Sequence, residues 1–443
     1  MNWIAAAANY PVSEGNRMSL DIIRVGADGD GIGALADGTP LYVPFTLPGE
    51  SVEARPVSKR GDGMVGVAEA ITRPSAARIA PVCAHFGSCG GCALQHWRED
   101  EYGLWKAGLL AAALRRAGYD DAPVAALITC PSATRRRVDL AVRRMGEKLV
   151  LGLHQAHARE IVELRECPVL DPVLAALLAP LGAALKRLTG LRREASAILN
   201  LLDSGPDLLL RTDADLNAVD RSILAAFAHT HGLPRISWAR EKGLPEPVAG
   251  LRPARTMLSG IEIVPPPGAF LQASPVGEAA IIAAVMAGLP AKLPAKARIA
   301  ELYAGCGTLS FALARVARVM AWEGDAPAVA ALRAGARQAG LEGQITATQQ
   351  DLARRPVLGG EFAPFAVAVL DPPFAGAAAQ IAQIAASALR RVVYVSCNPA
   401  ALARDAALLR QAGFAVLAAT PIDQFLWSAR LESVVVFARQ RPV

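Results

Sequence analysis

The sequence predicts an α/β fold whose C-terminal part contains a mostly parallel sheet. Three observations support this. Apolar runs typical of strands alternate with alanine-rich helical stretches from residue 257 onward, short apolar runs alternate with glycine turns near the N-terminus, and cysteines gather between these parts. Alternation of strands and helices is characteristic of parallel sheets with crossover helices. The expected divisions are a flexible segment 1–17, a small β-barrel 18–75, a mixed central domain 76–256 and an α/β domain 257–443.

The length and composition indicate a folded, multidomain protein. A chain of 443 residues is too long for one ordinary core, and 53% hydrophobic against 19% charged residues is typical of globular proteins. The N-terminus carries no positive charge ahead of its apolar stretch, and no apolar segment supplies about 20 uninterrupted residues for a membrane span. We therefore expect a cytoplasmic protein with no membrane association, no obligate protein partner and a monomeric state.

The net charge is mildly positive, at +6 with a pI near 9.0. A phosphate-rich partner would be attracted to such a surface, although a basic protein without a nucleic-acid role fits the charge equally well. Five arginines lie in the alternating, strand-like segment RRRVDLAVRR, where they can also form a solvated sheet edge: Arg135, Arg136, Arg137, Arg143 and Arg144. Charge alone leaves these interpretations open.

The N-terminal strands, in GIGALADGTPLYVPFTLPGESVEARPV, are separated by turns at Gly38 and Gly49. Barrels of the OB type often bind oligonucleotides, but that is an analogy of fold, and a barrel that only packs on the rest of the chain fits the pattern too. Helical patterns follow at residues 99–117 and 170–188.

A glycine turn follows the first strand of the α/β domain, in ELYAGCGTLS. Gly305 and Gly307 are needed there because side chains would keep a ligand from the backbone. Glu323 ends the next strand 18 residues after Gly305, a spacing suited to a ribose diol, and Asp351 is a candidate for the adenine amine. Ser310 stands where a nicotinamide fingerprint favours Gly or Ala, which favours S-adenosylmethionine because it has no pyrophosphate. A purely structural turn is the alternative.

Two further polar residues end later strands. Asp371 follows the fourth strand in DPPF, and Cys397 follows the fifth in SCNP. The carboxyl ends of parallel strands reach the same rim, so both should lie beside the cofactor glycines. An isolated buried cysteine is usually a small apolar residue, but Asn398 and Pro399 directly after Cys397 indicate an exposed turn.

Glu432 begins the last apolar strand, in LESVVVF, where a carboxylate is costly unless it is paired or used. Cys397 and Glu432 together suit methylation of uracil carbon 5. That carbon is a poor nucleophile, so a thiolate must add to carbon 6, and a base must later remove the carbon 5 proton before the thiolate leaves. Cys397 is the predicted nucleophile and Glu432 the predicted base.

Several motifs, in order, resemble the uracil-5 RNA methyltransferases and most closely their iron-sulfur branch, which modifies 23S ribosomal RNA. They are Cys83-x5-Cys89-Gly-Gly-Cys92 followed by ALQHW, ECPVLDP with Cys167, PGAFLQAS, YAGCGT, DPP and SCNP. The resemblance covers nearly the whole chain. It implies a Rossmann-like class I methyltransferase domain with a TRAM-like OB barrel, S-adenosylmethionine as cofactor and RNA as partner.

The resemblance also implies roles residue by residue, with Cys397 as nucleophile and Glu432 as base. The residues implied at the cofactor are Gln272, Tyr303, Gly305, Gly307, Glu323, Asp351 and Asp371. Those implied at the substrate are Phe270, which shares the F-x-Q motif with Gln272, Asp371 and Phe374. The helix at 99–117 is expected to pack back on the methyltransferase domain.

Two positions depart from the family pattern. Phe374 stands where the family usually has arginine after DPP, and Arg430 where it has histidine two residues before the base. D-P-P-[FY] also resembles enzymes that methylate exocyclic amines, which need no cysteine. A non-catalytic RNA-binding or ribosome-assembly factor is the other alternative. The combination of Cys397 with Glu432 favours uracil over both.

The cysteine cluster is a candidate metal site, since disulfides are rare in a reducing compartment. Four thiolates can hold either zinc or a [4Fe-4S] cluster, and the spacing does not choose between them. The resemblance implies the iron-sulfur cluster, with four ligands: Cys83, Cys89, Cys92 and Cys167. Cys130 and Cys306 have no predicted chemical role.

Overall fold

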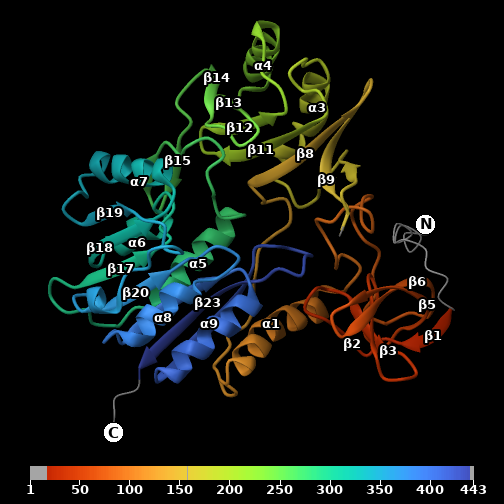
Figure 1. The fold of residues 1–443 in the computed structure, drawn as a ribbon, viewed down its shortest axis with the longest axis horizontal. Helices are drawn as coiled ribbons and strands as arrows, with labels where there is room; N and C mark the ends of the chain where they lie inside the picture. Colours follow the sequence, from red (N-terminus) through yellow and green to blue (C-terminus); the bar gives the residue numbers. More distant parts are fainter. Residues whose placement is uncertain (1–16, 157, 440–443) are drawn as a thin grey trace.

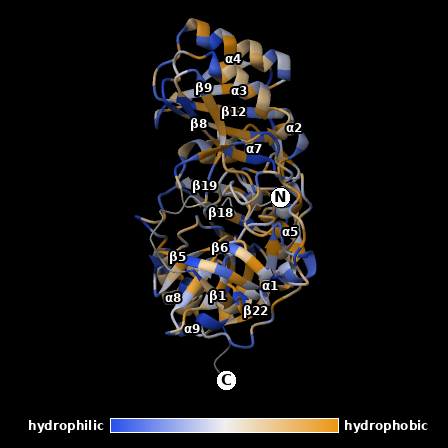
Figure 2. Ribbon diagram, turned by 90° about the vertical axis from the view of Figure 1, so that its right-hand side faces the viewer, coloured by the Kyte–Doolittle hydropathy of each residue, from blue (hydrophilic) through white to orange (hydrophobic). Residues whose placement is uncertain are grey.

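The computed structural model describes residues 17–156 and 158–439 and arranges them around three large sheets (Figure 1). The expectation for the segment 1–17 falls outside the described residues except at residue 17. Turned by 90°, the molecule is elongated, with the seven-stranded sheet at one end and the N-terminal sheet and α1 toward the other (Figure 2). Among the described residues, no helix is long and apolar enough to cross a membrane.

The N-terminal sheet has six strands in the order β1-β5-β6-β4-β3-β2. Its strands are β1 (Met18–Asp21), β2 (Arg24–Val25), β3 (Gly31–Ala34), β4 (Pro40–Val43), β5 (Ser51–Arg60) and β6 (Gly63–Arg73). The sheet curls so far that a Cβ on Gly33 of β3 would lie 2.8 Å from the Asp21 carbonyl oxygen of β1. The predicted barrel is therefore a half-barrel, since β1 and β2 remain the two edges of one sheet.

The central sheet has seven strands in the order β10-β9-β8-β11-β12-β13-β14. They are β8 (Arg137–Met145), β9 (Lys148–His154), β10 (Ile161–Glu163), β11 (Glu194–Leu202), β12 (Gly205–Thr212), β13 (Arg235–Arg240) and β14 (Glu246–Gly250). Helices α2 (Pro172–Ala175), α3 (Leu178–Lys186) and α4 (Ala218–His231) pack beside it. The helix expected over 170–188 is interrupted between α2 and α3, because Pro180 has no N–H to continue the first helix.

The arginine-rich segment forms β8, which lies between β9 and β11 and is not an edge. Arg136, just before β8, is buried and forms an ion pair with Glu278 at 2.6 Å. Arg144 donates to the carbonyls of Leu185, Lys186, Leu188 and Leu191. The interpretation as a solvated sheet edge was wrong, because these guanidinium groups satisfy buried or turn-forming partners.

The C-terminal sheet has eight strands in the order β19-β18-β17-β20-β21-β23-β22-β7. They are β7 (Ile128–Thr129), β17 (Arg298–Leu302), β18 (Arg318–Glu323), β19 (Ile345–Gln349), β20 (Val367–Leu370), β21 (Arg391–Ser396), β22 (Phe414–Asp423) and β23 (Glu432–Arg439). The five strands from β19 to β21 are parallel, whereas β23 runs antiparallel to both β21 and β22. The chain moves outward from β17 to β19 and returns at β20, so the topological switch point lies between β17 and β20.

Helices cover both faces of this sheet and complete the predicted α/β architecture. One core contains residues of α5 (Pro275–Ala287), α6 (Thr308–Leu313) and α7 (Ala326–Gln338). The other contains residues of α1 (Glu99–Arg116), α8 (Ala378–Ala386) and α9 (Pro399–Gln411). A short 3-10 helix (Gly359–Phe362) also joins the second core, and the hairpin of β15 (Thr256–Leu258) and β16 (Ile261–Ile263) joins the first. Helix α1 thus packs on the C-terminal sheet, as the resemblance implied.

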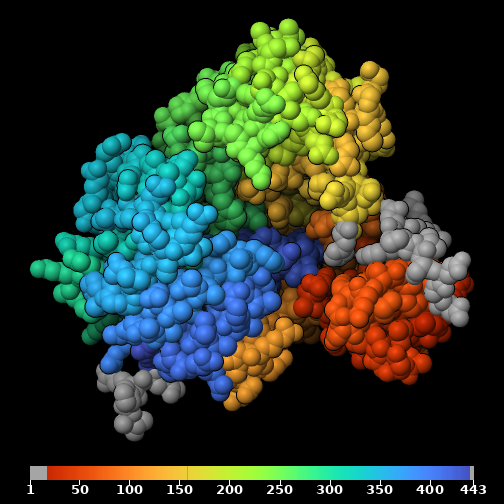
Figure 3. All heavy atoms as spheres, in the orientation of Figure 1, coloured from red at the N-terminus to blue at the C-terminus, as the bar shows by residue number. Residues whose placement is uncertain are grey.

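Helix α1 also fastens the loop 424–431, which joins β22 to β23. Lys106 of α1 is fully buried, and its Nζ donates to Asp423 Oδ1 at 2.5 Å and to the carbonyls of Phe425 and Arg430. The Tyr102 hydroxyl donates to Asp423 Oδ2 at 2.7 Å and accepts the Trp427 N–H at 2.8 Å. In the space-filling view, dark-blue atoms from near the C-terminus lie between the red atoms of the N-terminal sheet and the lighter blue atoms of the C-terminal domain (Figure 3).

Candidate active site

The predicted nucleophile and base lie opposite each other across neighbouring strands. The antiparallel pairing of β21 with β23 runs from Arg391 and Ala438 to Ser396 and Ser433. Continuing that register by one residue places Cys397 opposite Glu432. Residues facing each other across an antiparallel pair have Cβ atoms about 5 Å apart. Two positions that are 35 residues apart in the sequence therefore meet at one point on the rim.

Cys397 leaves β21 and is held beside the loop after β20. The next residue, Asn398, caps α9 by accepting the Ala400 N–H at 3.0 Å, and its Nδ2 donates to the Phe374 carbonyl at 2.9 Å. This bond joins the turn of SCNP to the turn of DPPF. Burial, together with the carboxylates of Glu432 and Asp371, raises the pKa of the Cys397 thiol to about 12, and Arg430 opposes this shift. The thiol needs help to ionise.

A chain of two amides links the carboxylates. Gln424, at the end of β22, donates through Nε2 to Glu432 Oε2 at 2.7 Å and to Gln272 Oε1 at 2.9 Å. Gln272 in turn donates through Nε2 to Asp371 Oδ2 at 3.0 Å. All these groups are at least partly buried, so the network fixes the positions of both acids, and both act electrostatically on Cys397.

Glu432 is 3% exposed, and no group among the described residues hydrogen-bonds its Oε1. Burial and the nearby charge of Asp371 raise its pKa well above the usual range, while the bond from Gln424 opposes this shift. Burial also raises the pKa of Asp371 to about 7, and Gln272 opposes that shift. A buried carboxylate with one unpartnered oxygen and a raised pKa is suited to accepting a proton.

The central sheet positions the loop that carries Gln272. Arg136 donates through Nε to the Gln272 carbonyl at 3.0 Å, and its N–H donates to the Ala273 carbonyl at 2.9 Å. Asn200 of β11 donates through Nδ2 to the Ala269 carbonyl at 2.9 Å. Phe270, on the same loop, is 68% exposed, with the guanidinium carbon of Arg137 5.9 Å from its ring centre. Part of the arginine cluster therefore supports the rim.

The turn after β17 has the backbone that its glycines predicted. Tyr303, Gly305 and Gly307 all have positive φ, of 66°, 55° and 104°. A Cβ on Gly305 would meet no protein atom within 4 Å, whereas one on Gly307 would lie 2.5 Å from Leu332 Cδ1. Gly305 therefore faces open space, and Gly307 is required by close packing.

The two candidate cofactor acids border that turn. Glu323 accepts the N–H groups of Gly305 and Asp325, each at 2.8 Å. Asp351 is exposed and lies beside Gly324, because a Cβ on Gly324 would be 3.8 Å from the Asp351 Cα. Ser310 has a structural role, since its hydroxyl donates at 2.5 Å to the buried carboxyl of Glu301.

Comparison with known proteins agrees with the chemistry that this geometry suggests. A family model described as Conserved hypothetical protein 95 matches residues 287–401. An uncharacterized RNA methyltransferase of Caulobacter vibrioides is 40% identical, over 95% of this chain and 99% of the relative. The 23S rRNA (uracil(1939)-C(5))-methyltransferase RlmD of Aeromonas salmonicida is 32% identical, over 90% of this chain and 92% of the relative. The chain belongs to the RNA (uracil-C5) methyltransferase family.

A solved structure extends the likeness to the whole fold. The tRNA (uracil-54, C5)-methyltransferase of Pyrococcus abyssi, in complex with S-adenosyl-L-homocysteine, superposes with a TM-score of 0.72 over 95% of this chain and 100% of that one. The identity is 20%, so this match shows the fold. The predicted class I methyltransferase architecture and the prediction of an RNA methyltransferase are confirmed.

The four predicted metal-binding cysteines of this methyltransferase gather near the end of β9, where Cys89 pairs with Gln155. Their thiols act on one another electrostatically, and burial raises the pKa values of Cys83, Cys89 and Cys92. The Gly91 N–H points at Cys89 Sγ at 3.4 Å, a contact that favours a thiolate. A Cβ on Gly90 would lie 2.8 Å from the His154 carbonyl oxygen, so the loop lies close against β9. Four neighbouring thiols have the donor chemistry of a metal site, but among the described residues no three of these sulfurs lie within 4.8 Å of one another, so the metal group stays a prediction.

Two neighbours of this cluster were not predicted. Ligand atoms of Cys83, His85 and Glu166 lie within 4.8 Å of one another. The His85 ring is already engaged, since its Nε2 accepts the Arg165 N–H at 3.3 Å and its Nδ1 lies 3.7 Å from Cys83 Sγ. Their spacing in the sequence gave no signal beyond the cysteines themselves.

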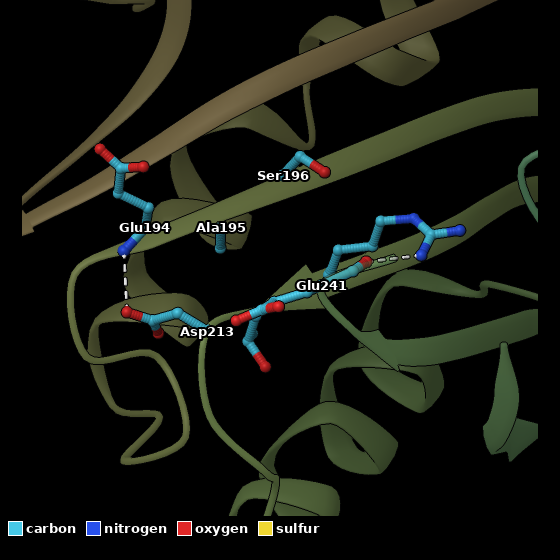
Figure 4. Close-up of a pocket in the computed structure, with 7 residues that line it drawn as sticks. Glu194, Ala195, Ser196, Asp213 and Glu241 are labelled. Carbon is cyan, nitrogen blue, oxygen red and sulfur yellow. Dashed lines mark hydrogen bonds between the residues drawn. The ribbon is translucent and has the colours of Figure 1, made fainter. Parts of the chain in front are cut away.

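A separate depression lies on the central sheet of the methyltransferase, away from the strand ends described above (Figure 4). It is lined by Glu194, Ala195, Ser196, Arg211, Thr212, Asp213 and Glu241. Asp213 accepts backbone N–H groups at 192–194, and Arg211 donates to the carbonyls of Glu241 and Gly243. Asp213 and Arg211 therefore stabilise the loops around the depression, and none of the predicted site residues lines it.

Gln424 is a member of the buried network at the candidate site that was not predicted from the sequence. Its only signal was its position, since it follows the apolar strand β22 as Asp371 and Cys397 follow theirs. Nothing local indicated that its amide would join Gln272 to Glu432.

Proposed function

We propose that this methyltransferase transfers a methyl group from S-adenosylmethionine to carbon 5 of a uridine in RNA, with 23S ribosomal RNA as the expected substrate. The observation that carries the proposal is the proximity of Cys397 to Glu432 at the end of the β21–β23 register, with Glu432 Oε1 buried and without a hydrogen-bond partner in the described part of the chain. In this proposal, the parts at 18–75 and 76–256 engage RNA, and the part at 257–443 carries the chemistry.

The cofactor lies against the turn after β17 in this proposal. Glu323 receives the ribose hydroxyls and Asp351 the adenine amine, while the positive φ of Gly305 leaves open space beside the backbone. Tyr303, Gly307, Gln272 and Asp371 complete its surroundings. Bound there, the sulfonium supplies an electrophilic methyl group to the base at the switch point.

The chemistry starts at the Cys397 sulfur. The thiolate adds to carbon 6 of uracil, and the electrons of the carbon 5–carbon 6 bond move toward the oxygen on carbon 4 to form an enolate. Carbon 5 then takes the methyl group. Glu432 removes the proton from carbon 5, the double bond re-forms and the carbon–sulfur bond breaks. The raised pKa of Glu432 makes its carboxylate a stronger base than an exposed one.

The rim residues hold the base in this proposal. Asp371, its Oδ2 already bound to Gln272, presents its other oxygen to the uracil edge. Phe270 and Phe374, exposed by 68% and 48%, offer rings on which RNA bases can stack.

The four cysteines are proposed to hold a [4Fe-4S] cluster with a structural role. The two residues after Cys92 donate their N–H groups to the Trp427 carbonyl at 2.8 and 3.0 Å, so the cysteine segment adjoins the loop that leads to Glu432. No redox step is required for methyl transfer.

Two variants test the covalent mechanism from opposite ends. Cys397→Ala should abolish methyl transfer and leave no RNA attached to protein, while cofactor binding persists. Glu432→Gln should leave methylated RNA attached, seen as a slow band in denaturing gels. A 5-fluorouridine substrate should trap the same species on the unmodified enzyme. Turnover by Cys397→Ala would overturn the mechanism, and a product methylated on an exocyclic amine would favour the alternative suggested by DPPF.

A further inference from the structure

Arg430 and Phe374, the two residues that depart from the family pattern, contact each other at the mouth of the site. The guanidinium carbon of Arg430 lies 4.2 Å from the centre of the Phe374 ring, within the range of a cation–π contact. Both side chains are exposed. They come from different elements, the loop before β23 and the loop after β20, so the contact depends on the folded site.

Hydrogen bonds fix the backbone of both partners. The Arg430 carbonyl accepts Lys106 Nζ at 2.5 Å, and its N–H donates to Ser428 Oγ at 3.1 Å. The Phe374 carbonyl accepts Asn398 Nδ2 at 2.9 Å, and Asn398 directly follows Cys397. The backbone that carries the guanidinium is therefore fixed two residues from the base, and the backbone that carries the ring is bonded to the residue beside the nucleophile.

The reaction needs a positive charge at this place. Among the described residues, the two charged side chains that act most strongly on the Cys397 sulfur, Glu432 and Asp371, are both acids, and the next is the cation Arg430. Both acids oppose the thiolate, and both would oppose the enolate that follows. Developing negative charge is best stabilised by a cation that is already oriented.

We propose that Arg430, whose guanidinium lies over the Phe374 ring, is the cation that stabilises the Cys397 thiolate and the uracil enolate. Phe374 is then a positioning residue for the guanidinium, and its opposite face remains available to a base. No bond to Arg430 forms or breaks. The statement about the thiolate stands on the geometry of the protein, whereas the statement about the enolate rests on the proposed function.

The first experiment needs no RNA. Full-length protein is alkylated with iodoacetamide at pH 8, and the rate at Cys397 is followed by mass spectrometry of its peptide. A nearby opposite charge lowers the pKa of a thiol, and a shift of about one is the expected size here, because Arg430 acts on Cys397 more weakly than either acid. Losing it in Arg430→Gln should leave about tenfold less thiolate, partly offset by higher nucleophilicity, for a net slowing of about three- to fourfold.

The variants separate charge from shape. Arg430→Lys keeps the charge and should stay within about twofold of wild type, whereas Phe374→Leu frees the guanidinium and should fall between wild type and Arg430→Gln. Arg221→Gln is the matched control, because Arg221 lies over Trp238 at 5.4 Å on the central sheet and should leave the rate unchanged. Thermal unfolding confirms that each variant is folded.

If Cys397 is alkylated in Arg430→Gln at the wild-type rate, the proposal is overturned. The same holds if Cys397 is alkylated as slowly in Arg430→Lys as in Arg430→Gln. The enolate is tested by the rate of adduct formation with 5-fluorouridine RNA, which Arg430→Gln should slow by a larger factor than it slows alkylation. An equal or smaller factor would overturn the enolate part alone. If wild type forms no adduct, the proposed function fails, while the alkylation result still judges the role of Arg430 at the thiolate.

Discussion

Gln424→Leu should slow the release of methylated RNA without slowing methyl transfer. The substitution keeps the buried volume but removes the donors to Glu432 and Gln272 and the acceptor for the Ala273 N–H. A hydrogen bond to a charged group contributes about 1.5–3 kcal/mol. If the ionised form of Glu432 loses about 2 kcal/mol of stabilisation, the pKa of Glu432 rises and its ionised fraction falls about 30-fold. Removal of the carbon 5 proton should slow by a smaller factor than this, because the carboxylate that does ionise is a stronger base.

A single-turnover experiment with S-adenosylmethionine labelled in the methyl group measures both steps. Rapid quenching followed by a denaturing gel separates methyl groups in the protein–RNA band from those in free RNA. Gln424→Leu should form the band at the wild-type rate and then retain it. Gln380→Leu is a matched control, because Gln380 is fully buried and makes two backbone bonds to Val357, at 2.9 and 3.0 Å, in another part of the domain.

Two results would refute this reasoning. If methylation slows and the band never accumulates, Gln424 acts before methyl transfer and not through the base. If Gln380→Leu slows release equally, the effect comes from a general loss of stability.

Two further predictions concern stability and metal content. Burial raises the pKa of Glu301 from its ordinary 4.5 to about 8, so its contribution to stability is complete below about pH 4.5 and is lost as the pH rises toward 8. Urea unfolding should therefore show a loss of about 2 kcal/mol in the free energy of unfolding between pH 6 and 8, and Glu301→Gln should lack this loss. An equal change of the free energy of unfolding with pH in both proteins would contradict this prediction. Protein purified without oxygen should be brown with about four irons per chain and should lose them in Cys89→Ser, whereas stoichiometric zinc without iron would contradict the cluster.

The parts of the site that follow strand ends could be predicted from the sequence. Gly305, Asp371 and Cys397 each stand directly after an apolar run, and parallel topology sends those ends to one rim. Glu432 was recognisable because a carboxylate at the start of an apolar strand needs a reason. Each signal is local in the sequence. The rule that parallel strands end at the same edge of a sheet then predicts that these residues lie close together.

The contacts between distant segments could not be predicted. Gln424 and Gln272 are 152 residues apart, and Arg136 and Glu278 are 142 apart, yet each pair is in direct contact. Arg430 and Phe374 were each recognised as unusual, but only the fold shows that one lies on the other. The sequence predicted the N-terminal strands but not the incomplete closure of their sheet, because closure depends on how far the strands coil against one another.

The anchoring of the loop 424–431 by α1 limits how this protein can be divided. A fragment beginning at residue 257 would contain every proposed catalytic residue, but it would lack Lys106 and Tyr102, which satisfy Asp423. Stripping a buried ion pair of one partner costs about 3–5 kcal/mol, a large part of the stability of a domain. Recombination between relatives should therefore keep α1 and the C-terminal sheet from the same parent, even where a boundary between them looks convenient in the sequence.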